Sequence, residues 1–385
     1  MINNQNNRNH YLQILTWLSI GIILGSLVGG TYIHNLNSNV SNSTDDSNFF
    51  HYYAFVFNGH GSNVSVIDRI SKTLLYSQNL NIEYDNIDAL LNPVSNYLYI
   101  VSVDNSVHNS NVYVLDSTNF DIKYIIPAGK NLQHGGVITN NGELLLIVNR
   151  EDNSLILIDT VKNIVVERIK VGKNPHDVEL SNNNNYAYIS NTESRSISII
   201  DINNKIIIDE ISLNIEPWML IFFKNNNNLI VTSGNPNSIV ELNLKNHSVD
   251  NLLMLSSEPH GISLSEKNNF VLIALPNENV VAVVDLNDFN IIKKIDVGDY
   301  PYQLNISPDE SYAYVLNTGS DNVSVIDLEQ LNVVSTIAVD QGPTDVLFYL
   351  PNSDSNVQSN NDNDDSENEF DAARFTCGAY IHVRD

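Results

Sequence analysis

Short runs of β-branched and aromatic residues alternate with polar clusters along most of the chain. In the stretch that begins at His176, these runs are DVEL, YAYIS, SISIID and KIIIDEISL, separated by clusters rich in Asn and Ser. Runs of this kind between turn signals predict β-strands. No run keeps a helical period of 3.6 residues over a useful length, so the pattern predicts an all-β domain.

The four-strand pattern recurs along the chain, and the recurrence is regular. Equivalent positions are held, each 42 residues after the last, by His134, His176, Trp218, His260, Tyr302 and Thr344. Four strands in about 42 residues make one blade of a β-propeller. The repeat therefore predicts a propeller with four-stranded blades.

The number of blades follows from the two ends of the repeat. First-strand positions occur seven times, counting one at Ile87, and sets of the other three strands also occur seven times. The first set, between Tyr52 and Gln78, has no first strand of its own, and the last first strand, at 344–350, has no set of its own. We expect these two parts to pair and to close residues 51–351 into a seven-bladed propeller without a long free edge.

One interval in the repeat is longer than the others. Ile87 and His134 are 47 residues apart, and we place most of the extra five residues in the segment SVDNSVHNSN, at 102–111. This segment is expected to be a lengthened loop within its blade.

The N-terminal segment is long and apolar enough to cross a membrane. Residues 11–33 contain no charged side chain, and 23 helical residues span a hydrocarbon core of about 30 Å. Arg8 precedes the segment, which favours a cytoplasmic 1–10 and an external propeller. A cleaved signal peptide is the alternative, because residues 25–30 are rich in small side chains. The sequons, at Asn39, Asn42, Asn63, Asn246, Asn305 and Asn322, fit an external location.

Three further segments lie outside the repeat. Residues 34–50 are predicted to be a polar stalk. Residues 352–369 have no basic or aromatic side chain and are predicted to be a disordered acidic linker. Residues 370–385 regain aromatic and aliphatic side chains, and we expect this tail to dock on a folded surface.

Charge and cysteine content exclude several classes of function. The formal net charge is −26, from 45 acidic and 19 basic side chains, so the surface repels phosphate backbones and no nucleic-acid partner is expected. Such a charge suits a secreted or cell-surface protein, although it also serves solubility alone. The single cysteine, Cys377, leaves no internal disulfide, no CxxCH haem-attachment motif and no paired CxxC zinc motif.

The ends of the second strands carry a family resemblance. The segments YVLN, YISN and LIVN, followed by a polar gap and then V-x-V-I-D, resemble the YVTN propeller repeat over residues 52–350. The resemblance implies a β-propeller and a relation to cell-surface proteins, including archaeal surface proteins. Related propellers include lactonases and redox enzymes, so the resemblance implies no single activity.

The positions that open the first strands are predicted to form a ring at one mouth of the central channel, because first strands line that channel. The ring residues are Ile87, His134, His176, Trp218, His260, Tyr302 and Thr344. Three of them are histidines, and three neutral imidazoles around a metal with an open fourth position would be a catalytic zinc or copper site. The structural alternative is a Pro-His turn whose ring nitrogen bonds to the backbone, at a polar, water-filled mouth.

The resemblance also bears on the ring. Propeller lyases such as the peptidyl-hydroxyglycine lyases hold a metal through histidines at comparable positions, which implies His134, His176 and His260 as the matching residues. Nitrous oxide reductase also gathers histidines at a propeller mouth, but this chain lacks the paired-Cys copper domain. Gluconolactonase-type propellers use carboxylate ligands, and none falls at a ring position.

Carboxylates recur at two other positions of the repeat. Asp88, Asp177 and Asp345 directly follow a ring residue and are predicted to accept hydrogen bonds between blades, because strand neighbours face opposite sides. A second set closes the third strands and is predicted to cap the turns that follow: Asp68, Asp116, Asp159, Asp201, Asp285 and Asp327.

Two more arrangements bear on catalysis. Cys377 and His382 form a C-x4-H pair that would add metal ligands if the tail folded back over the channel. No G-x-S-x-G turn occurs, so no Ser-His-Asp site is proposed.

Two functions from different classes remain open from the sequence. The first is an anchored scaffold whose loops bind a cell-surface protein, an envelope polymer or a small ligand. The second is a metal-dependent lyase, hydrolase or oxidoreductase that uses zinc or copper on the three ring histidines.

Overall fold

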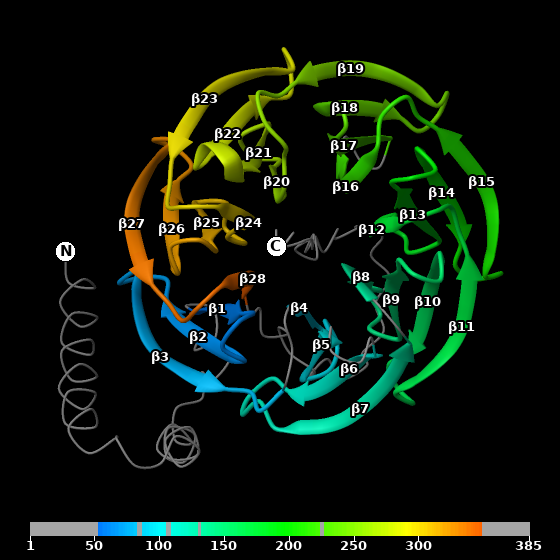
Figure 1. Cartoon of the computed structure of the whole chain (residues 1–385), viewed down its shortest axis with the longest axis horizontal. Coiled ribbons are helices and arrows are strands. Elements are labelled where there is room, and N and C mark those ends of the chain that lie inside the picture. Colours follow the sequence, from blue (N-terminus) through cyan, green and yellow to red (C-terminus); the bar gives the residue numbers. More distant parts are fainter. Residues whose placement is uncertain (1–52, 83–86, 105–108, 130–131, 224–226, 349–385) are drawn as a thin grey trace, which may run out of the picture. The chain divides into compact units, whose positions relative to one another are not determined.

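The structure, a computed structural model, describes residues 53–348 except for 83–86, 105–108, 130–131 and 224–226. Seven four-stranded antiparallel sheets surround a central axis (Figure 1), so the predicted seven-bladed propeller is confirmed. No helix in this part of the chain is long and apolar enough to cross a membrane. The predicted anchor at 11–33, the stalk, the linker and the tail all lie outside the described residues.

Each blade runs outward from the axis through four strands. The inner strands are β4 (Ile87–Leu91), β8 (Leu132–Ile138), β12 (Pro175–Leu180), β16 (Pro217–Phe223), β20 (Ile262–Ser265), β24 (Pro301–Ile306) and β28 (Pro343–Phe348). The second strands are β1 (Tyr53–Asn58), β5 (Tyr97–Asp104), β9 (Leu144–Asn149), β13 (Tyr186–Asn191), β17 (Asn228–Gly234), β21 (Phe270–Leu275) and β25 (Tyr312–Asn317).

The other two positions complete each sheet. The third strands are β2 (Asn63–Asp68), β6 (Asn109–Asp116), β10 (Ser154–Asp159), β14 (Ser196–Asp201), β18 (Asn237–Asn243), β22 (Val280–Asp285) and β26 (Asn322–Asp327). The outer strands are β3 (Thr73–Asn79), β7 (Ile122–Gly129), β11 (Ile164–Lys170), β15 (Ile206–Ser212), β19 (Ser248–Met254), β23 (Asn290–Asp296) and β27 (Asn332–Ala338).

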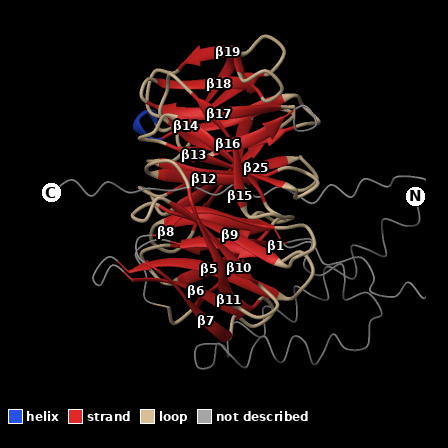
Figure 2. Ribbon diagram, turned by 90° about the vertical axis from the view of Figure 1, so that its right-hand side faces the viewer, coloured by secondary structure: helices blue, strands red, loops and turns tan. Residues whose placement is uncertain are grey.

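The connecting loops gather on two opposite faces (Figure 2). A short 3₁₀ helix, η3 (Pro276–Glu278), joins β21 to β22 on one of these faces. Because β20 and β21 are antiparallel, β20 begins beside the end of β21, on the face that carries η3. The inner strands therefore all begin on this face, where the ring residues are expected.

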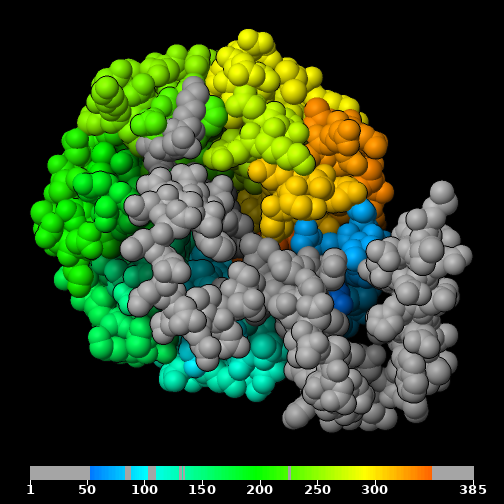
Figure 3. All heavy atoms as spheres, turned by 180° about the vertical axis from the view of Figure 1, so that it is seen from behind, coloured from blue at the N-terminus to red at the C-terminus, as the bar shows by residue number. Residues whose placement is uncertain are grey.

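The ring of blades is closed by the last strand. β28 pairs with β1 and gives the sheet order β28-β1-β2-β3, with Val56 opposite Val346. Figure 3 shows the same meeting of the two ends, because the blue residues of β1 to β3 lie against the orange ones. The repeat count assigns this place to the strand at 344–350.

The cores lie between blades, and the middle strands contribute to two cores at once. In β9, Leu145 and Ile147 pack toward the blade of β4 to β7, whereas Leu146 and Val148 pack toward the blade of β12 to β15. Successive side chains of a strand face opposite sides, so a strand buried on both faces is apolar throughout. This requirement explains runs such as LLLIVN.

The Asn that recurs at the end of the second strand ties that strand to the third in three blades. The Nδ2 atoms of Asn58, Asn191 and Asn317 donate to the hydroxyls of Ser65, Ser198 and Ser324, over 2.9 Å in each blade. These Asn side chains are fully buried. In these three blades the YVLN-type pattern therefore corresponds to a buried side-chain hydrogen bond across a hairpin, whereas Nδ2 of the equivalent Asn149 has no hydrogen-bond partner among the described residues.

The Asp residues that close the third strands cap the following turns, as predicted. Oδ1 of Asp68 accepts from the amides of Ile70 and Ser71, and equivalent bonds are made by the other members of the set, Asp116, Asp159, Asp201, Asp285 and Asp327.

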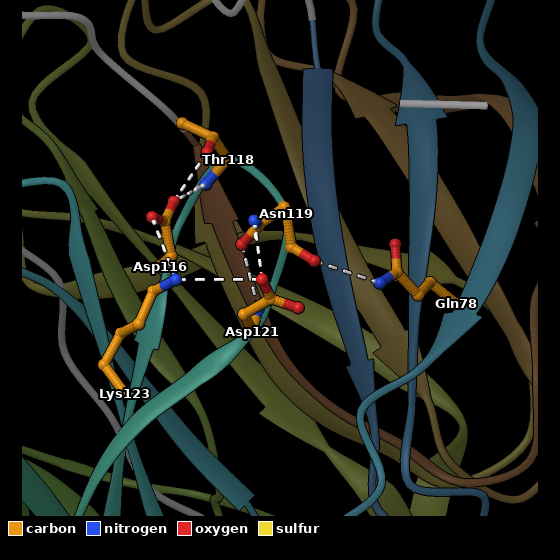
Figure 4. Close-up of polar contacts among 6 residues, drawn as sticks. All are labelled: Gln78, Asp116, Thr118, Asn119, Asp121 and Lys123. Atoms are coloured by element: carbon orange, nitrogen blue, oxygen red, sulfur yellow. Dashed lines mark hydrogen bonds and ion pairs between the residues drawn. The ribbon is translucent and has the colours of Figure 1, made fainter. Parts of the chain in front are cut away.

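Figure 4 shows one of these turns, between β6 and β7, where Asp116 accepts from both the amide and the hydroxyl of Thr118. The same turn reaches the preceding blade, because Gln78 Nε2 donates to the carbonyl oxygen of Asn119 over 3.2 Å. A capped turn therefore also serves as a contact between blades.

The blade with the long interval accommodates its extra residues differently from the prediction. β5 extends to Asp104 and β6 begins at Asn109, so the two strands have eight residues each. The segment 102–111 is therefore largely paired strand, because an antiparallel hairpin can lengthen by whole ladder steps. Residues 105–108, at its tip, lie outside the described residues.

The hairpin hydrogen bond can be tested with a pair that the chain itself provides. Leu275 and Ala282 occupy the positions equivalent to Asn191 and Ser198. Asn191→Leu alone is expected to lower the free energy of unfolding by about 1–3 kcal/mol, because it leaves the buried hydroxyl of Ser198 without its hydrogen-bond donor. The double variant Asn191→Leu/Ser198→Ala should regain most of that loss, as urea denaturation would measure. Equal losses in the single and double variants would contradict a role for the hydrogen bond.

Candidate functional site

The ring positions lie where the inner strands begin. His176, Trp218, Tyr302 and Thr344 are the second residues of β12, β16, β24 and β28. Ile87 and His134 lie on β4 and β8, but their side chains are outside the described residues. His260 differs from the prediction, because it lies two residues before β20 rather than on it.

A β-bulge accompanies the ring position. In the pairing of β12 with β13, Pro175 lies opposite Asn191 and Asp177 opposite Ser190, so the register of this pairing passes over His176. At the equivalent place before β20, the His260 amide donates to the Ala274 carbonyl oxygen, and the Ala274 amide donates to the Gly261 carbonyl oxygen. His260 and Gly261 thus both lie opposite Ala274. Such a bulge changes the direction in which the side chain of the extra residue points.

Other blades show the same irregularity, although the pairing of β4 with β5 is regular, with Ile87 opposite Ser102. The pairing skips Tyr302 in β24, and in β16 it skips both Trp218 and Met219. Because each extra residue breaks the alternation of its strand, its side chain need not join the cores between blades. The bulges therefore explain why one position per repeat can carry site residues.

Five rings from successive blades contact one another, and we call them the aromatic wall. Its members are His176, Trp218, His260, Tyr300 and Tyr302. His176 stacks on Trp218 with ring centroids 5.5 Å apart and an interplanar angle of 5°. Trp218 meets His260 edge to face at 5.6 Å and 77°, and His260 contacts Tyr302 at 4.6 Å. Tyr300 stacks on Tyr302 at 5.9 Å.

Glycine makes room for the wall at two points. A Cβ atom on Gly234 would lie 2.4 Å from Cζ2 of Trp218. A Cβ atom on Gly261 would lie 2.9 Å from the carbonyl oxygen of Tyr302. Both distances are shorter than any van der Waals contact, so these positions need glycine for the rings and strands to approach.

The wall is partly accessible and partly buried. Trp218, His260 and Tyr300 are partly exposed, whereas His176 is 8% exposed and Tyr302 is fully buried. Burial lowers the pKa of His260 from 6.5 to about 4, so its imidazole is neutral at physiological pH. Burial, and then the charge of Glu258, raise the pKa of Tyr300.

The predicted three-histidine metal site is not tested by this arrangement. Trp218 contacts both His176 and His260, and the side chain of His134 is not described. Within the part of the chain that the structure describes, no three His, Cys, Asp or Glu side chains are placed to hold a metal ion. Cys377 and His382 lie outside that part, so both metal assignments remain predictions.

Two residues of the site were not identified from the sequence. Tyr300 and Glu258 occupy one repeat position, two residues before the ring, and Glu216 holds the same position in the preceding blade. The 42-residue repeat therefore already relates these residues to one another and to the ring position. It was missed because this position lies in the loop before the inner strand, where β-strand patterns give no information.

The Asp residues that follow the ring join neighbouring inner strands, as predicted for two of the three. Asp177 Oδ2 accepts from the Leu220 amide of β16 over 2.8 Å, and Asp345 Oδ2 accepts from the Ala89 amide of β4 over 3.0 Å. Oδ2 of Asp88 has no hydrogen-bond partner among the described residues. Where glycine replaces Asp, the backbone makes the join directly, because the Gly261 amide donates to the Tyr302 carbonyl oxygen over 2.8 Å.

Burial perturbs the titration of these carboxyls. Burial raises the pKa of Asp177 and of Asp345 from 3.8 to about 7, although the backbone amides that they accept from act in the opposite direction. Burial also raises the pKa of Asp88, and the negative charges of Asp345 and Asp177 raise it further. The inner strands therefore surround a group of carboxyls that resist ionisation.

The raised pKa values predict a stability profile. A carboxyl whose pKa is higher in the folded than in the unfolded state binds extra protons on folding, so stability falls as pH rises from about 4 to about 7. Each group contributes a slope of up to about 1.4 kcal/mol per pH unit. We expect Asp177→Gln, which copies Gln303 at the equivalent position, to flatten this slope in urea denaturation at several pH values.

The control for this profile is the exposed Asp288, whose change to Asn should leave the slope unchanged. A wild-type stability that is constant or rises between pH 4 and pH 7 would contradict the assignment.

Comparison with known protein families gives one partial match. Residues 96–215 match the model of the cytochrome D1 heme domain. This match covers less than half of the chain and includes two of the ring histidines. No curated protein is significantly similar in sequence.

Solved structures resemble the chain in fold. A functionally unknown protein from Desulfotomaculum acetoxidans has a TM-score of 0.64 at 15% identity, over 78% of this chain and 99% of that one. Hydrazine synthase from Kuenenia stuttgartiensis has a TM-score of 0.61 at 17% identity, over 72% and 92%. Dihydro-heme d1 dehydrogenase NirN in complex with DHE has a TM-score of 0.57 at 15% identity, over 77% and 66%. At these identities the likeness is one of fold, and the chain is a β-propeller.

Proposed function

We propose that this chain is an extracytoplasmic binding propeller that takes its ligand on the aromatic wall. The contiguous contact of Trp218 with His176 and His260, continued to Tyr302 and Tyr300, is the observation that carries the proposal. The ligand is a small molecule or an exposed group of a cell-surface protein or envelope polymer.

Aromatic rings left partly exposed in mutual contact favour a binding role over a structural one. The cores between blades are built mostly from aliphatic side chains, whereas His176, Trp218 and Tyr302 stand at bulges of the inner strands. Aromatic surfaces supply large contact area and also hydrogen-bonding groups at their edges, which suits recognition of flat or cationic groups. The wall therefore concentrates binding chemistry at one point of a regular scaffold.

The location is part of the proposal and rests on the sequence. The uncharged segment 11–33 supports a single-pass anchor, and Arg8 before it supports an external propeller. The resemblance of residues 52–350 to YVTN repeats supports a place at the cell surface, and the net charge of −26 argues against nucleic acid.

Trp218 offers a direct test of binding. The chain has two tryptophans, Trp17 and Trp218, so Trp17→Phe leaves Trp218 as the single indole reporter. We expect a saturable change in its fluorescence when the full-length protein is titrated with at least one of adenosine, cellobiose and choline. Gly234→Ala should weaken that binding by about ten-fold or more, because the new methyl group displaces the indole.

A matched control is Gly172→Ala, whose Cβ would lie 2.6 Å from Cγ of Asn191 and would crowd that side chain instead of a wall ring, so it should leave binding unchanged. Unchanged Trp218 fluorescence with all three probes would contradict a ligand site on the wall.

The second candidate function is a metal-dependent lyase, hydrolase or oxidoreductase at His134, His176 and His260. The match of residues 96–215 to the cytochrome D1 heme domain favours it, because this segment contains His134 and His176. The neutral imidazole of His260 is also in the form that ligates metals. A metal there would supply Lewis-acid or redox chemistry, and the described side chains alone do not complete its ligand set.

Metal content separates the two candidates. The enzymatic candidate predicts about one zinc, copper or iron per chain in the purified full-length protein, lost in His176→Ala and retained in His247→Ala, which removes a surface histidine. Elemental analysis measures both. Substoichiometric metal, with no difference between the variants, would contradict the enzymatic candidate, and the binding function would then be the one remaining candidate.

A further inference from the structure

Four of the six N-x-S/T sequons of the chain lie in the part that the structure describes. They begin at Asn63, Asn246, Asn305 and Asn322. A sequon can carry a glycan only where the amide nitrogen of its asparagine reaches solvent, as it does in a surface loop. The place of each sequon in the propeller therefore decides whether it can be used.

The sequon at Asn305 is buried in an inner strand. The side chain of Asn305 is 4% exposed, and its Nδ2 donates to the Val346 carbonyl oxygen of the neighbouring inner strand over 2.8 Å. Ser307, which supplies the hydroxyl of the same sequon, is also buried. A glycan on Asn305 would therefore break a contact between blades.

The sequons at Asn63 and Asn322 belong to the hairpins that join second and third strands. Each asparagine is the first residue of a third strand, and that strand is paired along both edges. The serines of these sequons, Ser65 and Ser324, are buried and accept the hairpin hydrogen bonds described above. Neither sequon is therefore presented as an accessible loop.

Asn246 differs from the other three, because it lies in the turn between β18 and β19. Its side chain is exposed, as are those of Lys245 and His247 on either side. Oδ1 of Asn246 accepts from the amide of Ser248 over 3.1 Å and from its hydroxyl over 2.8 Å. Nδ2 of Asn246 makes no hydrogen bond to another described residue, so the nitrogen that a glycan would use is free.

The composition of the turn explains why this nitrogen is free. In the preceding blade, Nδ2 of the equivalent Asn204 donates to Oδ2 of the turn-capping Asp201 over 2.9 Å. In the blade of Asn246, Asn243 replaces that aspartate, and its own Nδ2 donates to Asp250 over 3.0 Å. An amide offers one acceptor oxygen where a carboxylate offers two. The replacement therefore removes the acceptor that holds the equivalent asparagine.

The turn that carries Asn246 lies on the face opposite the aromatic wall. β16 begins on the face of the wall, and β17 and β18 are each antiparallel to the strand before them, so β18 ends on the opposite face. The turn leads into β19, the outer strand of its blade. A glycan at this point would extend into solvent and leave the wall uncovered.

We propose that Asn246 is an N-glycosylation site, and that the folded propeller takes its glycan there instead of at the other three described sequons. In the reaction, Nδ2 of Asn246 forms a bond to the anomeric carbon of a sugar. The bond from that carbon to a phosphate oxygen of a lipid-linked glycan donor breaks, and the amide gives up a proton to the transferase. This inference rests on the external location in the proposed function, because sequons are used in secreted and surface proteins.

The test is peptide mass spectrometry on the full-length protein, purified from the cells that naturally make it. We expect a glycan on the peptide that contains Asn246 and unmodified peptides for Asn63, Asn305 and Asn322. Asn246→Gln and Ser248→Ala should each abolish the glycan, because each removes one residue that the sequon requires. Ser248→Thr should retain the glycan, because threonine also supplies a hydroxyl.

Asn204→Gln is the matched control. It changes the equivalent asparagine of the preceding blade, which is followed by Lys205 and Ile206 and opens no sequon, so the glycan on Asn246 should be unchanged. Location is measured separately by labelling intact cells with an amine reagent that does not cross membranes. An external propeller is labelled at exposed lysines such as Lys162, whose side chain is 68% exposed, and an internal one is not.

The two readouts distinguish the possible failures. A labelled propeller without a glycan on Asn246 overturns the glycosylation site and leaves the external location. An unlabelled propeller without a glycan overturns both. A glycan on Asn63, Asn305 or Asn322 overturns the statement that the fold selects Asn246.

Discussion

The inner strands of seven blades must approach one another around the axis, and the rest of the structure depends on how their backbones are joined there. Two devices make three of these joins. In one, a buried carboxylate accepts from an amide of the next inner strand, as Asp177 does from Leu220 and Asp345 from Ala89. In the other, Gly261 brings its own amide to the Tyr302 carbonyl oxygen, because a side chain there would collide with the neighbouring strand.

These joins also set the electrostatics of the channel. A carboxyl that accepts from an amide of the next inner strand is buried, and burial raises its pKa. The protein thereby gains a hydrogen bond between blades and accepts a carboxyl that is reluctant to ionise. A glycine at the same position buries no ionisable group, but it supplies no side chain. Some blades of the propeller have the carboxyl at this position and others have the glycine.

The candidate site arises from the same geometry. Where a bulge lies at the start of the inner strand, it releases one side chain of that blade from the two cores that the blade must fill. Residues 42 positions apart in the chain then become neighbours around the axis. Trp218 thus meets His176 and His260 although neither is near it in sequence, and Tyr300 extends the row from the loop before β24.

The sequence by itself determined the seven blades, their four strands, the turn-capping Asp residues and the ring position, because each depends on a local pattern repeated at a constant interval. It also identified Asp177 and Asp345 as acceptors between blades, since a strand neighbour of a channel residue faces the other way. The interval could not show which ring side chains touch, that Trp218 contacts both His176 and His260, or that Tyr300 and Glu258 belong with them. Those facts depend on the curvature of the closed ring, on the bulges and on the space left by Gly234 and Gly261, which only the tertiary structure decided.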